Sequence, residues 1–402
     1  MDLLTAEWST QLPLELQPLE MAERKGLGHP DTLCDLMAEA ISQALCTEYL
    51  RVAGRVLHHN IENAFLVAGR SEPAFGGGRV LGPMRFVYGD HATTDVDGRP
   101  LAVDAIAEAA ALGVLQQLIP HLDGARHIVF QNELRPGSAQ LVALVHAERA
   151  GANDTCIGSG FAPLSETETL IVAAERFLNS AAFKAEHPET GCDAKVTGVR
   201  RCSRLDLVIS LAFIGERVPS ERFYFEAKAA ICERLRTHLA PMQRRVQDLV
   251  VHINTADRRG AGADGVYLTV LGTAADGADG GQVGRGNRPC GLNSFARPLA
   301  AGAVAGKNPA AAVGKIYTLF AHHVAARIHQ AVPGLAEVYV WLASSIGERL
   351  DRPLTASLRL GPAQGCSPDP GRAAAARELL AREIEGIYAF AESLRMQPQP
   401  VC

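Results

Sequence analysis

The chain has 402 residues, of which 47% are hydrophobic and 21% are charged, a composition typical of a folded protein with enough apolar material for roughly two or three domains. Its 44 acidic and 39 basic residues give a net charge of −5, which excludes the strong positive field needed to bind nucleic acid or an anionic membrane surface. Nine cysteines without CxxC pairs, no signal-peptide pattern and no run of about 18 apolar residues predict a protein of the reducing cytoplasm that has no cysteine metal framework and does not enter a membrane.

Two kinds of apolar pattern alternate along the chain. Apolar residues three and four positions apart predict helices, and short runs rich in branched and aromatic residues predict strands. In chain order, the expected elements are a helix over 30–52, strands over 63–69 and 84–89, a helix over 102–119, a strand over 126–132, a helix over 165–180, a strand over 205–214, a helix over 218–240, strands over 248–254 and 265–272, a helix over 308–331, strands over 337–344 and 354–360, and a helix over 370–393.

Pairs of strands separated by one long helix are typical of an α+β fold, in which helices cover one face of a mostly antiparallel sheet. The pattern recurs about three times, which predicts three similar domains. We place them at 1–140, 141–260 and 261–402, with approximate boundaries because segments of different domains can interleave. The glycine-rich segment 257–288 contains a strand-like run, which favours a folded functional loop over a linker.

The sequence ERKGLGHPDTLCD, residues 23–35, places a glycine-bracketed loop, a histidine and an acid at the start of the first helix. The proline suits the first helical position, so His29 lies near the cap and Asp31 in the first turn. One interpretation of Asp31 is structural, because the helix dipole stabilises an acid at this end. The other is a metal-phosphate site: Gly26 and Gly28 open the backbone to a ligand, amides meet phosphate oxygens and the acid holds Mg²⁺.

Short polar and glycine-rich strings recur downstream beside predicted elements. GRGNR sets Arg285 and Arg288 among glycines, and GKNP places Lys307 before a proline that would open a helix. Taken singly, each is explained by a turn with a solvated base; together they predict a distributed polyphosphate site, because lysine and arginine both suit phosphate oxygens. The sequence contains no Walker or kinase signature, and GRGNRPCG lacks the strand, turn and helix context of a Rossmann motif.

These motifs, taken in order, carry a resemblance to a known family. The strings are ERKGLGHPDTLCD, LHHN, FGGG, ANDT, GFAPLS, ERFLNS, HINTAD, VYLTV, GRGNR and GKNPAAAVGKIY. Their order and spacing closely resemble those of the archaeal-type S-adenosylmethionine synthetases, or methionine adenosyltransferases, over residues 19–392. The resemblance implies three similar α+β domains about a pseudo-threefold axis, and a tight homodimer with active sites at the subunit interface.

The reaction that the resemblance implies joins ATP and L-methionine. The thioether sulfur attacks C5′ of the ribose in line and expels tripolyphosphate, which is then cleaved to pyrophosphate and phosphate. A neutral thioether has no proton to lose, so the site needs no general base; it needs alignment of sulfur with C5′ and neutralisation of the leaving group. Mg²⁺, lysine and arginine supply that positive charge, and K⁺ is a further candidate cation.

Carried over motif by motif, the resemblance assigns roles to individual residues. The implied metal ligands are Asp31 and Asp279, of which Asp279 faces either the metal or the methionine amine. The implied catalytic residues are His29, which donates to the region bridging ribose and phosphate, Lys195 and Lys307. The implied contacts to ATP or methionine are Glu62, Asp154, Arg285, Arg288, Lys307 and Lys315. Asp35, one helical turn after Asp31, is a candidate acid behind the metal site.

The sequence also departs from the family pattern. After HHN the family typically reads Thr-Asp-Gln, whereas this chain has Ile-Glu-Asn at 61–63, and Phe65 replaces a usual glutamate. Gln140 and Ala143 stand where the family tends to carry aspartates. These changes leave two alternatives open: a relative with the same ATP chemistry that uses another acceptor or favours triphosphate cleavage, and a nucleotide-binding paralogue without turnover.

Overall fold

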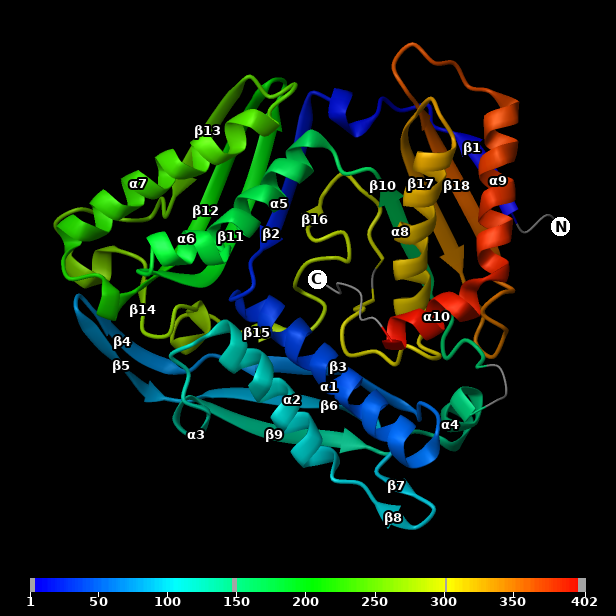
Figure 1. The fold of residues 1–402 in the computed structure, drawn as a ribbon, viewed down its shortest axis with the longest axis horizontal. Coiled ribbons are helices and arrows are strands. Elements are labelled where there is room, and N and C mark those ends of the chain that lie inside the picture. Colours follow the sequence, from blue (N-terminus) through cyan, green and yellow to red (C-terminus); the bar gives the residue numbers. More distant parts are fainter. Residues whose placement is uncertain (1–3, 147–149, 301, 397–402) are drawn as a thin grey trace.

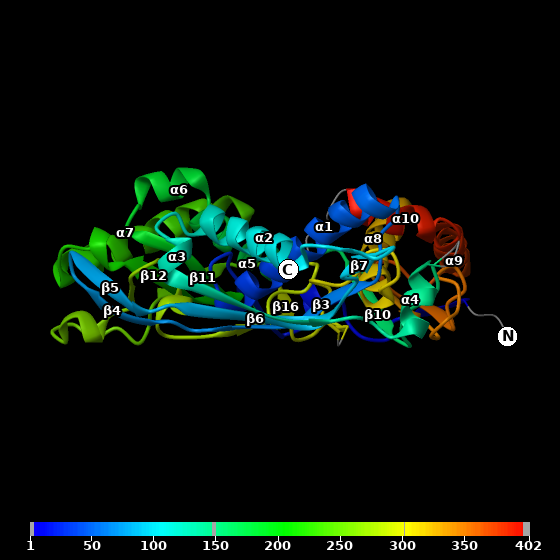
Figure 2. The same ribbon diagram turned by 90° about the horizontal axis from the view of Figure 1, so that it is seen from below.

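The computed structural model describes residues 4–146, 150–300 and 302–396. Three sheets form a flat layer, and the long helices lie together on one side of it (Figure 2). Seen face-on, three units surround a central region crossed by β2 (Leu19–Lys25) and by the loops that flank β16 (Asn293–Ser294) (Figure 1). The α+β class and the helix layer on one face are therefore confirmed.

The first unit is a four-stranded sheet covered by two helices. Its strands, in spatial order, are β15 (Gly281–Gln282), β3 (His59–Val67), β6 (Met84–Ala92) and β9 (Ile128–Arg135). Its helices are α1 (Pro30–Ala53) and α2 (Val103–Leu118). β3 and β6 are antiparallel, whereas β9 is parallel to β6 because α2 carries the chain back across the sheet.

The other two units repeat this order. The second contains β2, β11 (Thr190–Arg201), β12 (Arg204–Ile214) and β13 (Asp248–Ile253), with α5 (Glu166–Leu178) and α7 (Glu221–Leu239). The third contains β10 (Ile157–Ala162), β17 (Leu335–Ala343), β18 (Thr355–Pro362) and β1 (Leu4–Trp8), with α8 (Val313–Ala331) and α9 (Pro370–Glu385). In each unit an antiparallel central pair is followed by a parallel edge strand, β13 or β1. The prediction of three similar units is confirmed.

The sheets take strands from distant parts of the chain. β2 joins the second unit, β15 joins the first, and β1 closes the third from the beginning of the sequence. The limits 1–140, 141–260 and 261–402 thus remain a proposal for the bulk of each unit, with single strands crossing between them.

Apolar spacing builds the core as predicted. Leu33, Met37, Ile41 and Leu45 of α1 are fully buried, and each such side chain contributes roughly 1.5–3 kcal/mol relative to an exposed one. One continuous core underlies the first and third units, and a second fills the space beneath α5 and α7. Within the described ranges, no helix combines the length and apolar character needed to cross a membrane.

Most predicted elements are present, with three exceptions. The helix predicted over 308–331 begins only at Val313, and the helix predicted over 370–393 is divided at Gly386 into α9 and α10 (Ile387–Met396). The strand predicted over 265–272 is wrong for most of its length, because β14 covers only Leu268–Thr269. Besides β1, β2, β10 and β11, the α-helices and strands missed are α3 (Gly124–His127), α4 (Ala139–His146), α6 (Ala181–Glu186), β4 (Arg70–Ala74), β5 (Gly77–Gly82), β7 (Asp95–Val96), β8 (Arg99–Pro100), β15 and β16.

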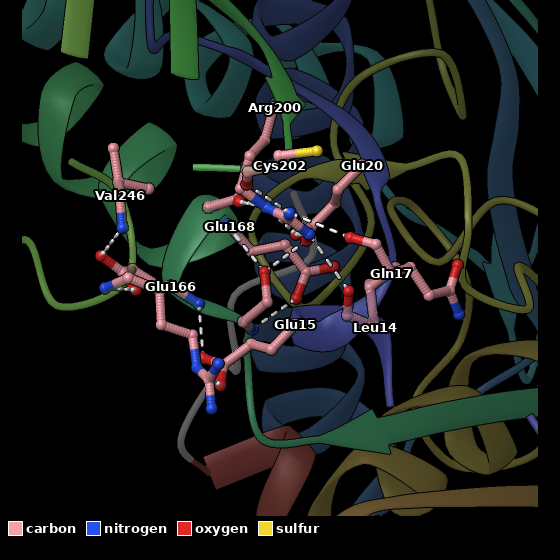
Figure 3. A network of polar contacts seen from close by, with 12 residues as sticks. Leu14, Glu15, Gln17, Glu20, Glu166, Glu168, Arg200, Cys202 and Val246 are labelled. Atoms are coloured by element: carbon pink, nitrogen blue, oxygen red, sulfur yellow. Dashed lines mark hydrogen bonds and ion pairs between the residues drawn. The ribbon is translucent and has the colours of Figure 1, made fainter. Parts of the chain in front are cut away.

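A buried charge network holds the segment before β2 against the second unit (Figure 3). Arg200 of β11 pairs with Glu20 at 2.9 Å and donates to the backbone oxygens of Leu14 and Gln17. Glu166 at the start of α5 accepts from the amides of three consecutive residues at 2.6–3.1 Å. A buried ion pair is tolerated when its remaining polar groups are also satisfied, and every guanidinium nitrogen of Arg200 has a partner. The network fixes β2, and therefore the loop after it, relative to β11.

Candidate functional site

A cavity of about 750 Å³ lies where the start of α1, strand β11 and two loops meet. Its walls include His29, Asp193, Lys195, Asn254, Tyr267 and Asp279. Three of these residues, His29, Lys195 and Asp279, were predicted from separate motifs. The structure thus brings one histidine, one lysine and one acid of the predicted site to a single cavity.

His29 is fixed by the start of α1. The helix begins at Pro30, and His29 Nδ1 accepts a hydrogen bond from the Asp31 amide at 3.2 Å, so the predicted cap is confirmed. Burial lowers the pKa of His29 to about 4, and the nearby Asp31 carboxylate opposes this shift only in part. The ring is therefore neutral at pH 7. Because Nδ1 is an acceptor, the hydrogen lies on Nε2, which can donate to a ligand.

Gly26 and Gly28 serve a different purpose from the one predicted. A Cβ on Gly28 would lie 2.2 Å from Cys192 Sγ, and a Cβ on Gly26 would lie 2.5 Å from the backbone oxygen of Ala194. The amides of both glycines donate to β11, at 2.9 and 3.0 Å. The close approach that requires glycine is therefore made by β11 rather than by a ligand, and it brings His29 next to Lys195.

Asp31 lies behind His29 and is nearly buried. One carboxylate oxygen accepts from Lys25 Nζ at 2.8 Å, and the other accepts from the backbone amide of Gln282 at 2.9 Å. Its Oδ2 atom is 3.9 Å from His29 Nδ1. A metal ion at Asp31 would have to compete with the ammonium of Lys25.

Lys195 and Asp279 are the accessible charges among the predicted residues of the cavity, whose wall also carries exposed Arg258 and Asp264. Lys195 Nζ is 3.1 Å from a carboxylate oxygen of Glu23, and about a third of its side chain is exposed. Asp279 is exposed on the opposite loop. Both groups can therefore meet a ligand without first leaving a buried environment.

Asp193 is a cavity residue that the sequence interpretation missed. Burial raises its pKa to about 7, while hydrogen bonds from the Ala274 amide at 2.9 Å and the Tyr267 hydroxyl at 3.3 Å act in the opposite direction. Its position two residues before Lys195 in the string CDAK was an available signal, because alternate residues of a strand share a face.

The GRGNR loop is held by Asp35. Its carboxylate accepts from the amides of Gly284 at 2.7 Å and Gly286 at 3.1 Å, and burial raises its pKa to about 7. Asp35 thus supports the backbone around Arg285 rather than the carboxylate of Asp31. Arg285 is exposed outside the cavity wall, and Arg288 donates to the oxygen of Gly284 at 3.1 Å.

The remaining predicted residues form a second group. Lys307 pairs with Glu62 at 2.8 Å, and Asp154 lies exposed on a loop near them. Lys315 is 2% exposed, and its ammonium lies 2.7 Å from both oxygens of Glu39, so in this structure it supports the Lys307 loop.

This second group is distant from the cavity. Ser42 of α1 donates to the backbone oxygen of Lys307 at 3.3 Å. Ser42 lies twelve residues along α1 from Pro30, or about 18 Å at 1.5 Å per residue. Within one chain, Lys307 and His29 therefore belong to separate sites.

The donors near the cavity suit a hard cation. Asp279 and Asp31 offer carboxylate oxygens, which Mg²⁺ prefers. In the part of the chain that the structure describes, no three His, Cys, Asp or Glu side chains form a ready metal cluster. Mg²⁺ commonly takes one or two protein carboxylates and completes its shell with phosphates and water. The residues present therefore fit a cation that arrives with a phosphate ligand.

Comparison with known proteins gives a consistent result. A family model described as S-adenosylmethionine synthetase (AdoMet synthetase) matches residues 3–397. Relatives named S-adenosylmethionine synthase are 40% identical in Pyrococcus furiosus (90% of each chain covered), Hyperthermus butylicus (93% of this chain, 91% of the relative) and Methanothrix thermoacetophila (96% and 95%). The structure of an unusual S-adenosylmethionine synthetase from Campylobacter jejuni has the same fold, with a TM-score of 0.55 at 16% identity over 96% of this chain and 87% of that one.

Proposed function

Since this chain belongs to the S-adenosylmethionine synthetase family and is an ATP-dependent methionine adenosyltransferase, we propose that the cavity beside His29 holds the ribose and triphosphate of ATP. The convergence of His29, Lys195 and Asp279 on that cavity supports the proposal. A neutral hydrogen-bond donor, an ammonium and a carboxylate are the groups that a magnesium-bound triphosphate needs around its reacting end.

In the proposed mechanism, the methionine sulfur forms a bond to C5′ as the C5′–O bond to the triphosphate breaks. Negative charge grows on the departing oxygen, to which His29 donates from Nε2. Lys195 neutralises charge on the phosphates. Preorganised donors of this kind contribute about 2.7–4 kcal/mol each to stabilising the transition state. The sulfur loses no proton, so no general base is needed, and neutral His29 can serve as the donor through Nε2–H.

Asp31 and Asp279 are the proposed Mg²⁺ ligands, and the ion would neutralise triphosphate charge when bound. This proposal rests on their position around His29 and on the preference of Mg²⁺ for carboxylate oxygens. K⁺ stays a second candidate cation. Arg285, Arg288 and Lys315 stay proposed phosphate ligands that require movement of the GRGNR and GKNP loops.

We further propose that the active enzyme is a homodimer in which Glu62, Asp154 and Lys307 of one chain complete the cavity of the other. The separation of about 18 Å along α1 supports it, because one chain does not bring both groups together. In a twofold dimer, the His29 group of each chain faces the Lys307 group of the other chain. The dimer therefore contains two complete sites.

The open face of the sheets supports the same assembly. Six exposed apolar strand residues alternate with residues buried beneath the helices: Leu19, Met21, Phe65, Val67, Val129 and Val208. Lys25 lies on this face too, in register with Lys195 of β11. The cavity therefore opens on the side that carries the apolar residues, where a second chain would cover both.

The eight cysteines that the structure describes carry free thiols, which supports a cytoplasmic location for this assembly.

Product analysis tests the acceptor and the fate of the triphosphate. The enzyme is incubated with ATP, Mg²⁺ and a panel of thioethers and amino acids, with and without K⁺, and the products are identified by mass spectrometry and phosphate analysis. We expect S-adenosylmethionine, pyrophosphate and phosphate from methionine. An adduct with another acceptor, or triphosphate hydrolysis without transfer, would contradict the assignment.

A further inference from the structure

Lys25 is the point at which the start of α1, strand β2 and the GRGNR loop meet. Its backbone N–H donates to the side chain of Asn287 at 2.9 Å, and its backbone oxygen accepts from the same side chain at 2.7 Å. The Thr32 hydroxyl also donates to that oxygen, at 3.2 Å. Its ammonium donates to Asp31 Oδ2 and to the backbone oxygen of Arg285. The roles proposed above leave this lysine without a function.

Two lysines and two acids form a linked charge cluster around Lys25, in which Glu23 also lies 3.9 Å from the Lys25 ammonium. Lys25 and Lys195 are directly opposite each other on β2 and β11, an arrangement that like charges disfavour. Asp31 compensates Lys25 at 2.8 Å, and Glu23, two residues before Lys25 on the same face, compensates Lys195 at 3.1 Å. Both acids are partly or nearly buried, so each needs a cation beside it.

The binding of a metal-bound triphosphate changes this balance. A divalent cation at Asp31 brings two positive charges to the carboxylate that Lys25 now neutralises with one. A magnesium-bound triphosphate is itself an anion, so it needs free ammonium groups. Displacement of Lys25 from Asp31 supplies one of them at the same position.

We propose that Lys25 is the resident counter-cation of Asp31 and becomes a positioning residue for the triphosphate when a divalent cation replaces it. This inference rests on the proposed metal role of Asp31. It makes metal binding and phosphate binding interdependent. Without phosphate, Lys25 competes with the metal ion for Asp31. With phosphate, the displaced ammonium of Lys25 binds the triphosphate instead. It also explains why a lysine is placed within hydrogen-bond distance of a proposed metal ligand.

Direct metal binding tests the inference without turnover. Mn²⁺ is titrated into the folded full-length enzyme in the absence of nucleotide, and free Mn²⁺ is measured by electron paramagnetic resonance. We expect Lys25→Met to bind Mn²⁺ at least about tenfold more tightly than the wild type. Lys25→Gln removes the charge but keeps a donor to Asp31, so it should give the same direction of change even if Lys25→Met folds poorly. Binding of tripolyphosphate with Mg²⁺, measured by calorimetry, should weaken about tenfold in both variants.

Control variants separate the inference from a general effect of charge. Arg327→Met breaks an ion pair outside the cavity, with Glu383 at 3.1 Å, and should leave Mn²⁺ affinity unchanged. Adding Asp31→Asn to Lys25→Met should abolish the gain. Unchanged Mn²⁺ affinity in both Lys25 variants, or an equal gain in Arg327→Met, would overturn the role of Lys25 while leaving Asp31 as a ligand. A gain that persists with Asp31→Asn would overturn the metal role of Asp31 and this inference with it.

Discussion

His29 Nδ1 accepts a hydrogen bond from the backbone amide of Asp31 at 3.2 Å, so one side chain both caps α1 and presents its other nitrogen to the cavity. Tethering through the cap gives the ring a fixed orientation and a fixed tautomer. The helix start is thereby part of the proposed active site and is also a stabilising feature of the fold.

The two roles of His29 can be separated by substitution. Asparagine is a good cap but too short to reach a ligand, so His29→Asn should stay within about 0.5 kcal/mol of wild-type stability. Its kcat should fall about 10²–10³-fold, because the donor to the departing oxygen is lost. Chemical denaturation and steady-state kinetics measure the two effects. His29→Ala should lose activity and also about 1 kcal/mol of stability; wild-type kcat in His29→Asn would refute the donor role.

The low pKa of His29 predicts a pH dependence of stability. The folded pKa is about 4, below the ordinary value of 6.5, so the unfolded chain binds the proton more tightly. The contribution of His29 is therefore fully present above pH 6.5 and is lost as the pH falls towards 4. As the pH falls from 6.5 to 4, the unfolding free energy of the wild type should therefore decrease relative to that of His29→Asn, whose asparagine does not titrate. A difference that is constant from pH 7 to pH 4 would show that His29 titrates normally.

Asp31→Asn tests the metal role. The amide keeps the size of the side chain but loses the charge that holds Mg²⁺, so Mg²⁺-dependent turnover should be abolished in a folded protein. Activity over a range of Mg²⁺ concentrations, with circular dichroism as the check on folding, measures this. Glu48→Gln is the control, since it removes another carboxylate of α1, one that pairs with Arg51 at the surface, and its Mg²⁺ dependence should stay normal. Near-normal activity of Asp31→Asn would exclude Asp31 as a ligand.

Gly28 is required by packing rather than by a ligand. Its Cβ would lie 2.2 Å from Cys192 Sγ and 2.6 Å from the amide nitrogen of Asp193, so Gly28→Ala should destabilise the protein by about 1–3 kcal/mol or more. Gly113 on α2 has open space around its Cβ position, and Gly113→Ala should stabilise by roughly 0.5–1 kcal/mol. Thermal unfolding of the two variants distinguishes them. Equal stability would contradict the close contact between the His29 loop and β11.

The sequence predicted the helices better than the strands. The four helices α1, α2, α5 and α7 have long amphipathic patterns and were placed within a few residues of their observed ends. β2 was missed because LEMAERK carries alternating charges, several of which belong to the buried network and the site. β1 and β10 were missed because they are short edge strands whose partners lie far away in the sequence.

The same limit applies to the site. Motif order was enough to select His29, Lys195 and Asp279, which do line one cavity. Motif order did not show that the Lys25 ammonium pairs with Asp31, that Asp35 accepts hydrogen bonds from the GRGNR loop, or that Lys315 forms a buried ion pair with Glu39. These pairings depend on contacts between segments more than 200 residues apart or on the direction of single side chains, and neither is encoded in local spacing.

In the proposed dimer, each active site combines the His29 group of one chain with the Lys307 group of another, and a mixed dimer distinguishes this arrangement from two independent sites. His29→Ala and Lys307→Ala chains carrying different affinity tags are co-expressed, and dimers with both tags are purified. One of the two sites in such a dimer then contains both substitutions and the other contains neither. We predict inactive parent homodimers and a mixed dimer with about half of the wild-type turnover. A mixed dimer as inactive as its parents would contradict the shared site.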